Sequence, residues 1–106
     1  MLTTGQKIAI EKTSASRLAT TDLENIKFGR VFSDHMFRMD HTGGEWRTPR
    51  IVPFGDMMMS PASLVLHYGQ SIFEGLKAYR TDNGEVALFR PEANISRMNR
   101  SAERMC

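Results

Sequence analysis

Three arginines near the C-terminus are the side chains best suited to bind an anion. Arg97, Arg100 and Arg104 recur at helical spacing within residues 91–105, so they lie on one side of a predicted helix. A solvated basic face is the ordinary interpretation of this pattern. Arg97 differs from the others because it lies nearest the edge of the apolar stripe of this helix, whereas Arg100 points away from the stripe. A planar guanidinium at that edge suits a phosphate or a carboxylate.

A second set of candidates lies in residues 66–80, which combine three aromatic rings with two glycines, a histidine and three charged side chains. This mixture predicts a backbone that bends closely around a ligand, with rings along one side. Core packing is the alternative, and it is strong for Phe73. Tyr68 precedes Gly69 at a predicted bend, and a buried tyrosine hydroxyl needs a partner. Phe73 and Glu74 face opposite sides of an extended backbone, so only one of them can face a pocket.

The remaining reactive side chains predict no metal site. His35, His41 and His67 are too scattered for a set of metal ligands, and we expect them to be exposed or structural. Asp34 and His35 could form an orienting pair, but no nucleophile accompanies them. The single cysteine, Cys106, excludes a disulfide within the chain and a zinc site built from several cysteines. Dinucleotide-binding and phosphate-loop glycine motifs are also missing from the sequence.

The composition is that of one small globular domain without a membrane segment. Of the 106 residues, 25% are charged and 41% are hydrophobic, and no apolar run approaches the length of a membrane-spanning helix. The polar start of the chain lacks a secretory signal, which predicts a cytoplasmic location. The net charge of +2 comes from an excess in the C-terminal segment, which argues against a nucleic-acid partner. The predicted C-terminal helix runs to the last residue without a cap, and we therefore expect a truncated chain.

The first half of the chain predicts an edge strand and a hairpin. Residues 1–22 form a loose surface segment in which 7–12 alternate as in a short edge strand. Residues 31–41 and 46–54 suit two strands joined by a turn at 42–44, which contains two glycines. Two prolines are expected to mark the irregular ends of the second strand.

The second half predicts a short helix, a hairpin and the C-terminal helix. Ser60 can cap a helix with Pro61 in its first turn, and this helix should end near Gly69. Residues 75–90 should form a hairpin in which the Asn-Gly pair at 83–84 supplies the positive φ angles of a tight turn. These elements together predict an α+β fold, with a mostly antiparallel sheet and helices packed on it.

The order of several motifs along the chain points to a family. The motifs are Phe28-Gly29, Phe32-Ser33-Asp34-His35-Met36, Ser60-Pro61-Ala62, the run from His67 to Arg80, Leu88-Phe89-Arg90-Pro91 and Asn94-Ile95-Ser96-Arg97-Met98. From about Gly5 to Cys106, the chain closely resembles the N-terminal part of branched-chain amino acid aminotransferases, which are fold-type IV pyridoxal-phosphate enzymes. The resemblance implies that residues 23–106 form an incomplete small N-terminal domain after the strand and loose segment at 1–22. The large cofactor-binding domain would be absent.

The resemblance also implies an activity and roles for individual residues. Such enzymes transfer the amino group of Leu, Ile or Val to 2-oxoglutarate through pyridoxal 5'-phosphate, and they are typically homodimers. Arg97 matches the arginine that binds the cofactor phosphate, and Phe28, Tyr68 and Phe73 match aromatic residues that line the substrate pocket. The Schiff-base lysine of the family lies further downstream, and Lys77 does not match it. We therefore expect no catalytic residue in these 106 residues, and the chain alone should be inactive.

Two alternatives remain open at this point. One is a different fold-type IV enzyme, such as a D-amino acid aminotransferase or an aminodeoxychorismate lyase. The runs Phe-Ser-Asp-His-Met and Phe-Glu-Gly-Leu-Lys-Ala-Tyr favour the branched-chain group over these enzymes. The other is a non-catalytic module that stands alone and binds a partner or an anion.

Overall fold

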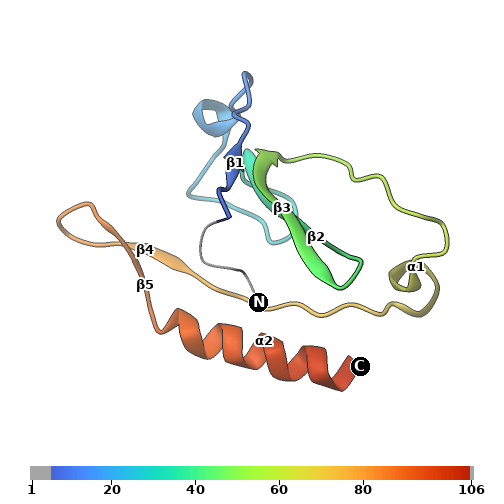
Figure 1. The fold of residues 1–106 in the computed structure, drawn as a ribbon. Coiled ribbons are helices and arrows are strands. Elements are labelled where there is room, and N and C mark those ends of the chain that lie inside the picture. The colour runs from blue at the N-terminus through green and yellow to red at the C-terminus, as the bar shows by residue number, and fades with distance from the viewer. Residues whose placement is uncertain (1–5, 106) are drawn as a thin grey trace. The chain divides into compact units, whose positions relative to one another are not determined.

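The computed structural model describes residues 6–105, which fall into two compact units, 6–57 and 58–105. The described residues form a small α+β structure with two α-helices and two sheets (Figure 1). The first unit contains β1 (Ala9–Ile10), the 3-10 helix η1 (Leu18–Thr20), β2 (His35–Thr42) and β3 (Glu45–Pro53). The second unit contains α1 (Leu64–Tyr68), β4 (Ala78–Arg80), β5 (Val86–Leu88) and α2 (Pro91–Met105). The α+β class predicted from the sequence is confirmed.

The sheet of the first unit has the strand order β1-β3-β2, so β3 is its central strand. Strand β2 pairs with β3 in the antiparallel direction, whereas β1 pairs with it in parallel, with Ala9 opposite Arg50. The edge strand predicted at 7–12 is confirmed, although only Ala9–Ile10 is paired. The hairpin is also confirmed, but its first strand begins at His35 rather than at residue 31.

The turn between β2 and β3 consists of Gly43 and Gly44 alone. Thr42 faces Glu45 across the ladder, and the two glycines have φ angles of +60° and +80°. Two-residue hairpin loops with positive φ at both positions match the right-handed twist of the strands that they join. The sequence prediction of a turn at 42–44 is therefore confirmed, and glycine adopts the positive φ angles of both central positions without strain.

Replacing Gly44 with alanine should destabilise the full-length protein by about 1 kcal/mol, because an L side chain is strained at this positive φ. The space around Gly44 is open, so the cost is one of backbone conformation and not of steric overlap. Gly55→Ala is the matched control, since Gly55 also has open surroundings but no positive φ. Equilibrium denaturation of both variants measures the difference. Equal stabilities of the two variants would contradict the turn geometry.

Strand β3 contains a bulge at Thr48 and Pro49. The register against β2 shifts between Arg38 and Asp40, and Thr48 has a positive φ of +50°. Proline has no N–H to donate to the ladder, so a bulge is one of the few places where a paired strand tolerates it. The prediction that both prolines mark the ends of the strand is wrong for Pro49, which lies inside β3. Only Pro53 lies at an end.

Ser60 opens a turn and does not cap helix α1. Its hydroxyl accepts a hydrogen bond from the N–H of Ala62 at 3.2 Å, and its carbonyl accepts one from the N–H of Ser63 at 3.0 Å. Helix α1 then starts after Ser63, which makes no side-chain cap. The prediction that Ser60 caps the helix is therefore wrong, because the N-cap position is Ser63. The predicted end is confirmed, because Gly69 adopts the left-handed conformation with φ +60° directly after Tyr68.

The hairpin predicted at 75–90 is present, but its strands are shorter and its turn is wider than expected. Among the described residues, only Gly84 of the Asn-Gly pair has a positive φ, at +83°. The N–H of Gly84 donates to the carbonyl of Thr81, and the N–H of Thr81 donates to the carbonyl of Glu85, both at 2.9 Å. The side chain of Thr81 also binds the backbone of Glu85, which favours this longer loop over a two-residue turn.

Helix α2 has the predicted bounds but not the predicted packing. In the second unit, which holds both α-helices, α2 does not lie on the β4–β5 ribbon (Figure 1). Side-chain hydrogen bonds join it to residues 70–75. No hydrophobic side chain of residues 6–105 is buried. The prediction of helices packed on a sheet is therefore not met within this unit.

Candidate functional site

Helix α2 carries Arg97, the candidate anion-binding residue. Pro91 occupies its start, where a missing N–H costs nothing, and Glu92 and Arg104 lie at the ends that their charges favour. Asn94 and Arg97 are three positions apart, so they share a face of the helix. That face is turned toward the extended segment that follows α1.

Glu74 and Arg97 form a two-point ion pair. The Nε of Arg97 donates to Oε2 of Glu74 at 2.7 Å, and its Nη2 donates to Oε1. Asn94 donates through Nδ2 to Oε1 of Glu74 at 3.0 Å and to the carbonyl of Gly75 at 2.7 Å. The two side chains differ in burial, because that of Glu74 is 10% exposed and that of Arg97 is 60% exposed. The pair thus has a shielded carboxylate and an accessible guanidinium.

The ion pair holds both groups in their charged forms. Hydrogen bonding from Arg97, with help from Asn94, lowers the pKa of Glu74 from 4.5 to about 2 although partial desolvation acts in the opposite direction. The pKa of Arg97 is raised by the same carboxylate. A lowered carboxylate pKa means that the pair contributes fully to stability above pH 4.5 and that this contribution is lost as the pH falls toward 2. Near neutral pH the pair is fully charged.

Sequence reasoning named Glu74 but missed its partner. The predicted separation of Phe73 and Glu74 is supported, because the Phe73 side chain is 90% exposed whereas the Glu74 side chain is shielded. The pairing with Arg97 joins residues 23 positions apart, and no local pattern encodes such a contact. The only local signal was the spacing of Asn94 and Arg97, which puts an amide beside the guanidinium on the helix.

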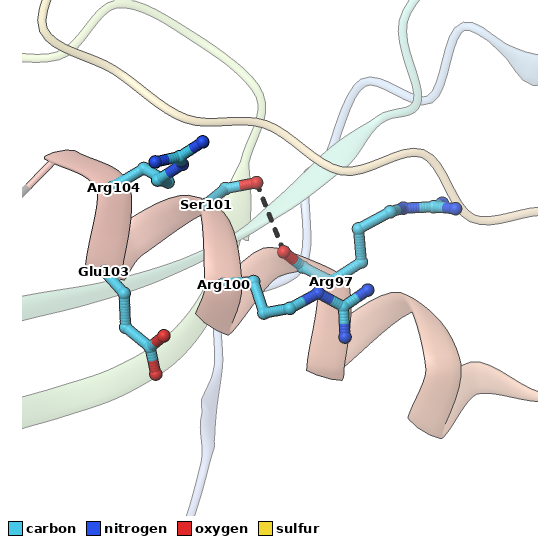
Figure 2. Close-up of a pocket in the computed structure, with 5 residues that line it drawn as sticks. All are labelled: Arg97, Arg100, Ser101, Glu103 and Arg104. Carbon is cyan, nitrogen blue, oxygen red and sulfur yellow. Dashed lines mark hydrogen bonds between the residues drawn. The ribbon is translucent and has the colours of Figure 1, made fainter.

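A shallow depression of about 420 Å³ lies on α2 beside this pair, lined by Arg97, Arg100, Ser101, Glu103 and Arg104. Figure 2 shows that the arginine side chains leave the helix in different directions. The Ser101 hydroxyl donates a hydrogen bond of 3.2 Å to the carbonyl of Arg97. Among the described residues, Arg97 alone of the three arginines forms an ion pair. This agrees with the prediction that Arg97 differs from a merely solvated basic face.

The predicted pocket aromatics are all exposed. Tyr68 is 83% exposed at the end of α1, and Phe73 is 90% exposed in the extended segment that follows. Phe28, in the first unit, is fully exposed at 104%. No stacked or edge-on ring contact joins any of them to another ring of the described residues. They are therefore accessible to a ligand or to another polypeptide segment, and none has the buried position that core packing would require.

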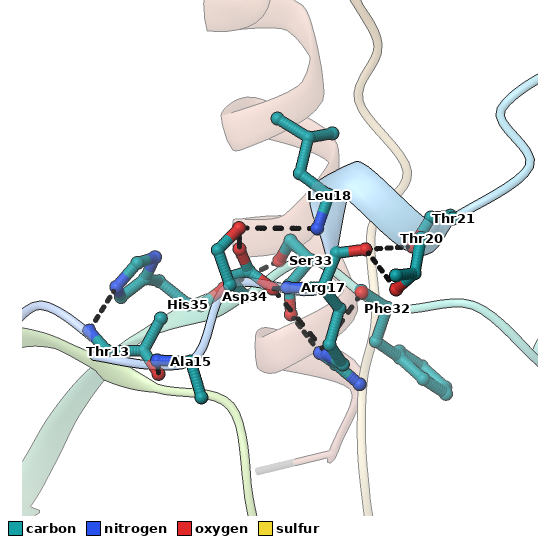
Figure 3. A network of polar contacts seen from close by, with 11 residues as sticks. Thr13, Ala15, Arg17, Leu18, Thr20, Thr21, Phe32, Ser33, Asp34 and His35 are labelled. Carbon is teal, nitrogen blue, oxygen red and sulfur yellow. Dashed lines mark hydrogen bonds and ion pairs between the residues drawn. The ribbon is translucent and has the colours of Figure 1, made fainter.

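The orienting pair that Asp34 and His35 could form by their sequence positions is not formed in the first unit. Asp34 accepts hydrogen bonds from the hydroxyl of Ser16 at 2.6 Å and from the N–H of Arg17 at 3.0 Å, whereas Nε2 of His35 accepts from the N–H of Thr13 at 3.0 Å (Figure 3). The Ser16 hydroxyl is the main cause of a lowered pKa at Asp34. Both side chains thus hold the segment that leads to η1, which confirms a structural role for His35.

Comparison with known proteins identifies relatives, although no family model matches the chain. The chain is 48% identical over 104 residues to branched-chain-amino-acid aminotransferase 2 of Bacillus subtilis, covering 97% of this chain and 28% of that protein. It is 55% identical over 85 residues to branched-chain-amino-acid transaminase 1 of the same organism, covering 79% of this chain and 24% of that protein. The chain is also 48% identical over 84 residues to a branched-chain-amino-acid aminotransferase of Mycolicibacterium smegmatis, which covers 78% of this chain and 23% of that protein.

The chain is related to the branched-chain aminotransferases. The family resemblance seen in the motifs is thereby confirmed, and the chain spans about a quarter of the length of these relatives. Within residues 6–105 of the chain, no cluster of His, Cys, Asp or Glu side chains could hold a metal ion. The same residues include no helix with the length and apolar character needed to cross a membrane.

Proposed function

We propose that the chain forms part of a branched-chain amino acid aminotransferase that uses pyridoxal 5'-phosphate and transfers the amino group of Leu, Ile or Val to 2-oxoglutarate. The observation that carries this proposal is the identity of 48% over 97% of the chain to a relative of that name. We also propose the fold-type IV architecture, with residues 23–106 in its small domain, a homodimer and a cytoplasmic location.

Arg97 fits a phosphate group. A guanidinium has five N–H donors, and Glu74 accepts only two of those of Arg97. The three others make no hydrogen bond to the described residues, and the side chain is largely exposed. A phosphate monoester presents oxygens that accept from two parallel N–H groups, which is the geometry that arginine offers. We therefore propose that Arg97 binds the cofactor phosphate and orients the cofactor, which when bound supplies the electron sink of the reaction.

The aromatic side chains suit the recognition of branched aliphatic substrates. Burial of each CH₂ group of a substrate against such rings contributes about 0.8 kcal/mol. Tyr68 and Phe73 in the second unit, and Phe28 in the first, are exposed and can provide this apolar surface. We propose that each of them contacts the substrate side chain, as the family resemblance implies.

The experiment that tests this function is a comparison of amino donors with the full-length protein. With pyridoxal phosphate and 2-oxoglutarate present, L-leucine and L-valine should be transaminated at least about tenfold faster than D-alanine, because a pocket selects by complementary apolar contact and handedness. Faster reaction with D-alanine would identify a D-amino acid aminotransferase instead. Failure to transaminate any of these donors would contradict the proposal.

A further inference from the structure

We propose that Glu74 is a positioning residue that, together with Asn94, fixes the guanidinium of Arg97 so that one of its edges stays open to the phosphate. This inference rests on the proposed function, because it assigns how the chain prepares the anion site of that same cofactor. Glu74 itself does not touch the phosphate in this arrangement. It acts only through the orientation of Arg97.

The guanidinium of Arg97 has two edges, each with parallel N–H groups. Nε and Nη2 form the edge that Glu74 occupies, with the Nε contact at 2.7 Å. The second edge carries the N–H groups of Nη1 and the remaining N–H of Nη2. No described residue accepts a hydrogen bond from these groups. An edge of this kind can bind two oxygens of one phosphate at the same time.

Glu74 and Arg97 differ in burial and in the number of contacts that anchor them. Glu74 is shielded and receives a second donor, Nδ2 of Asn94, at 3.0 Å. Asn94 also donates to the carbonyl of Gly75 at 2.7 Å, so it ties helix α2 to the backbone beside Glu74. The carboxylate is therefore the fixed partner, and the long, exposed arginine is the partner whose rotamer it selects. A side chain fixed before binding loses less conformational entropy when its ligand arrives.

Glu74 affects phosphate binding in two opposite ways, through its charge and through the orientation of Arg97. A carboxylate near a phosphate repels it, so Glu74 lowers the net attraction of the site. This repulsion is weak because Arg97 is 60% exposed and solvent and salt screen charges at the surface. Binding through two parallel N–H groups, in contrast, depends directly on the orientation of the guanidinium. We therefore expect the loss of orientation to outweigh the loss of repulsion when Glu74 is neutralised.

The test is a double-mutant cycle in the full-length protein. The measured quantity is the dissociation constant of pyridoxal divided by that of pyridoxal 5'-phosphate, and this ratio falls when the phosphate contributes less to binding. This ratio isolates the phosphate and needs no measurement of turnover. Glu74→Gln should lower the ratio by about three- to tenfold in the wild-type background and should change it no further in an Arg97→Ala background. Glu103→Gln is the matched control: Glu103 lines the same depression (Figure 2) but forms no ion pair with Arg97. It should leave the ratio unchanged.

Each outcome separates the inference from the proposed function. If Arg97→Ala lowers the ratio but Glu74→Gln does not, the positioning role is overturned and the phosphate role of Arg97 stands. An unchanged ratio in Arg97→Ala overturns the phosphate role itself. An equal lowering of the ratio by Glu103→Gln would show that the effect does not depend on contact with Arg97, and it would overturn the positioning role. Should Glu74→Gln fail to fold, Asn94→Ala removes one anchor of the carboxylate and should lower the ratio in the same direction, and an unchanged ratio there overturns the inference.

Discussion

Replacing Arg97 with alanine in the full-length protein is expected to weaken the binding of pyridoxal 5'-phosphate by about 10- to 100-fold. The change removes charge-assisted hydrogen bonds to the phosphate, and bonds of this kind contribute more than neutral ones. It also leaves the shielded carboxylate of Glu74 without its partner near the site. Titration of the cofactor-free protein with pyridoxal phosphate, followed by absorbance, measures the dissociation constant.

Substrate discrimination should change much less than cofactor affinity in this variant. At saturating cofactor, the ratio of kcat/KM for L-leucine over L-valine is expected to stay within about twofold of wild type, because Arg97 binds the phosphate and does not sort aliphatic side chains. Arg100→Ala is the matched control, since Arg100 lines the same depression but makes no ion pair with the described residues. Unchanged cofactor affinity in Arg97→Ala, or an equal loss in Arg100→Ala, would refute the phosphate role.

The features that the sequence predicted correctly are those set by neighbouring residues. Helix α2 has its predicted bounds because a proline start and a repeated apolar stripe are local signals. The turn at Gly43 and Gly44 follows in the same way, since it needs only two glycines between strands. The angular offset of Arg97 from Arg100 on the helix also came from local geometry, and it distinguished the residue that forms the ion pair.

The features that the sequence missed depend on competition or on distant partners. In the β4–β5 hairpin, an Asn-Gly pair predicted a tight turn, but the Thr81 side chain binds the backbone of Glu85 and widens the loop. Ser60 had the right residue type for a helix cap, but it closes a turn that precedes the helix. The contact of Glu74 with Arg97 spans 23 positions, so only the folded backbone could bring the two side chains together.

The 106-residue polypeptide, produced alone, is expected to unfold without a cooperative thermal transition. Burial of apolar surface is the main favourable term in folding, and it must offset a conformational entropy cost that rises with every ordered residue. No hydrophobic side chain is buried among residues 6–105, so this term is small. The circular dichroism signal of this polypeptide should change gradually on heating, and fluorescence of a hydrophobic dye should show strong binding at low temperature. The full-length protein should show a sharp thermal transition and little dye binding.

The exposed rings give the same polypeptide a second expected property, which is self-association. Phe28, Tyr68 and Phe73 present large apolar surfaces to solvent, and surfaces of this kind associate with one another when nothing else covers them. Sedimentation at increasing concentration should therefore show growing oligomers, and the substitutions Phe28→Ser and Phe73→Ser should reduce their size. A monomeric wild-type polypeptide with a sharp melting transition would contradict both expectations. It would show that polar contacts such as the Glu74–Arg97 pair stabilise the second unit far more than pairs with one exposed partner usually do.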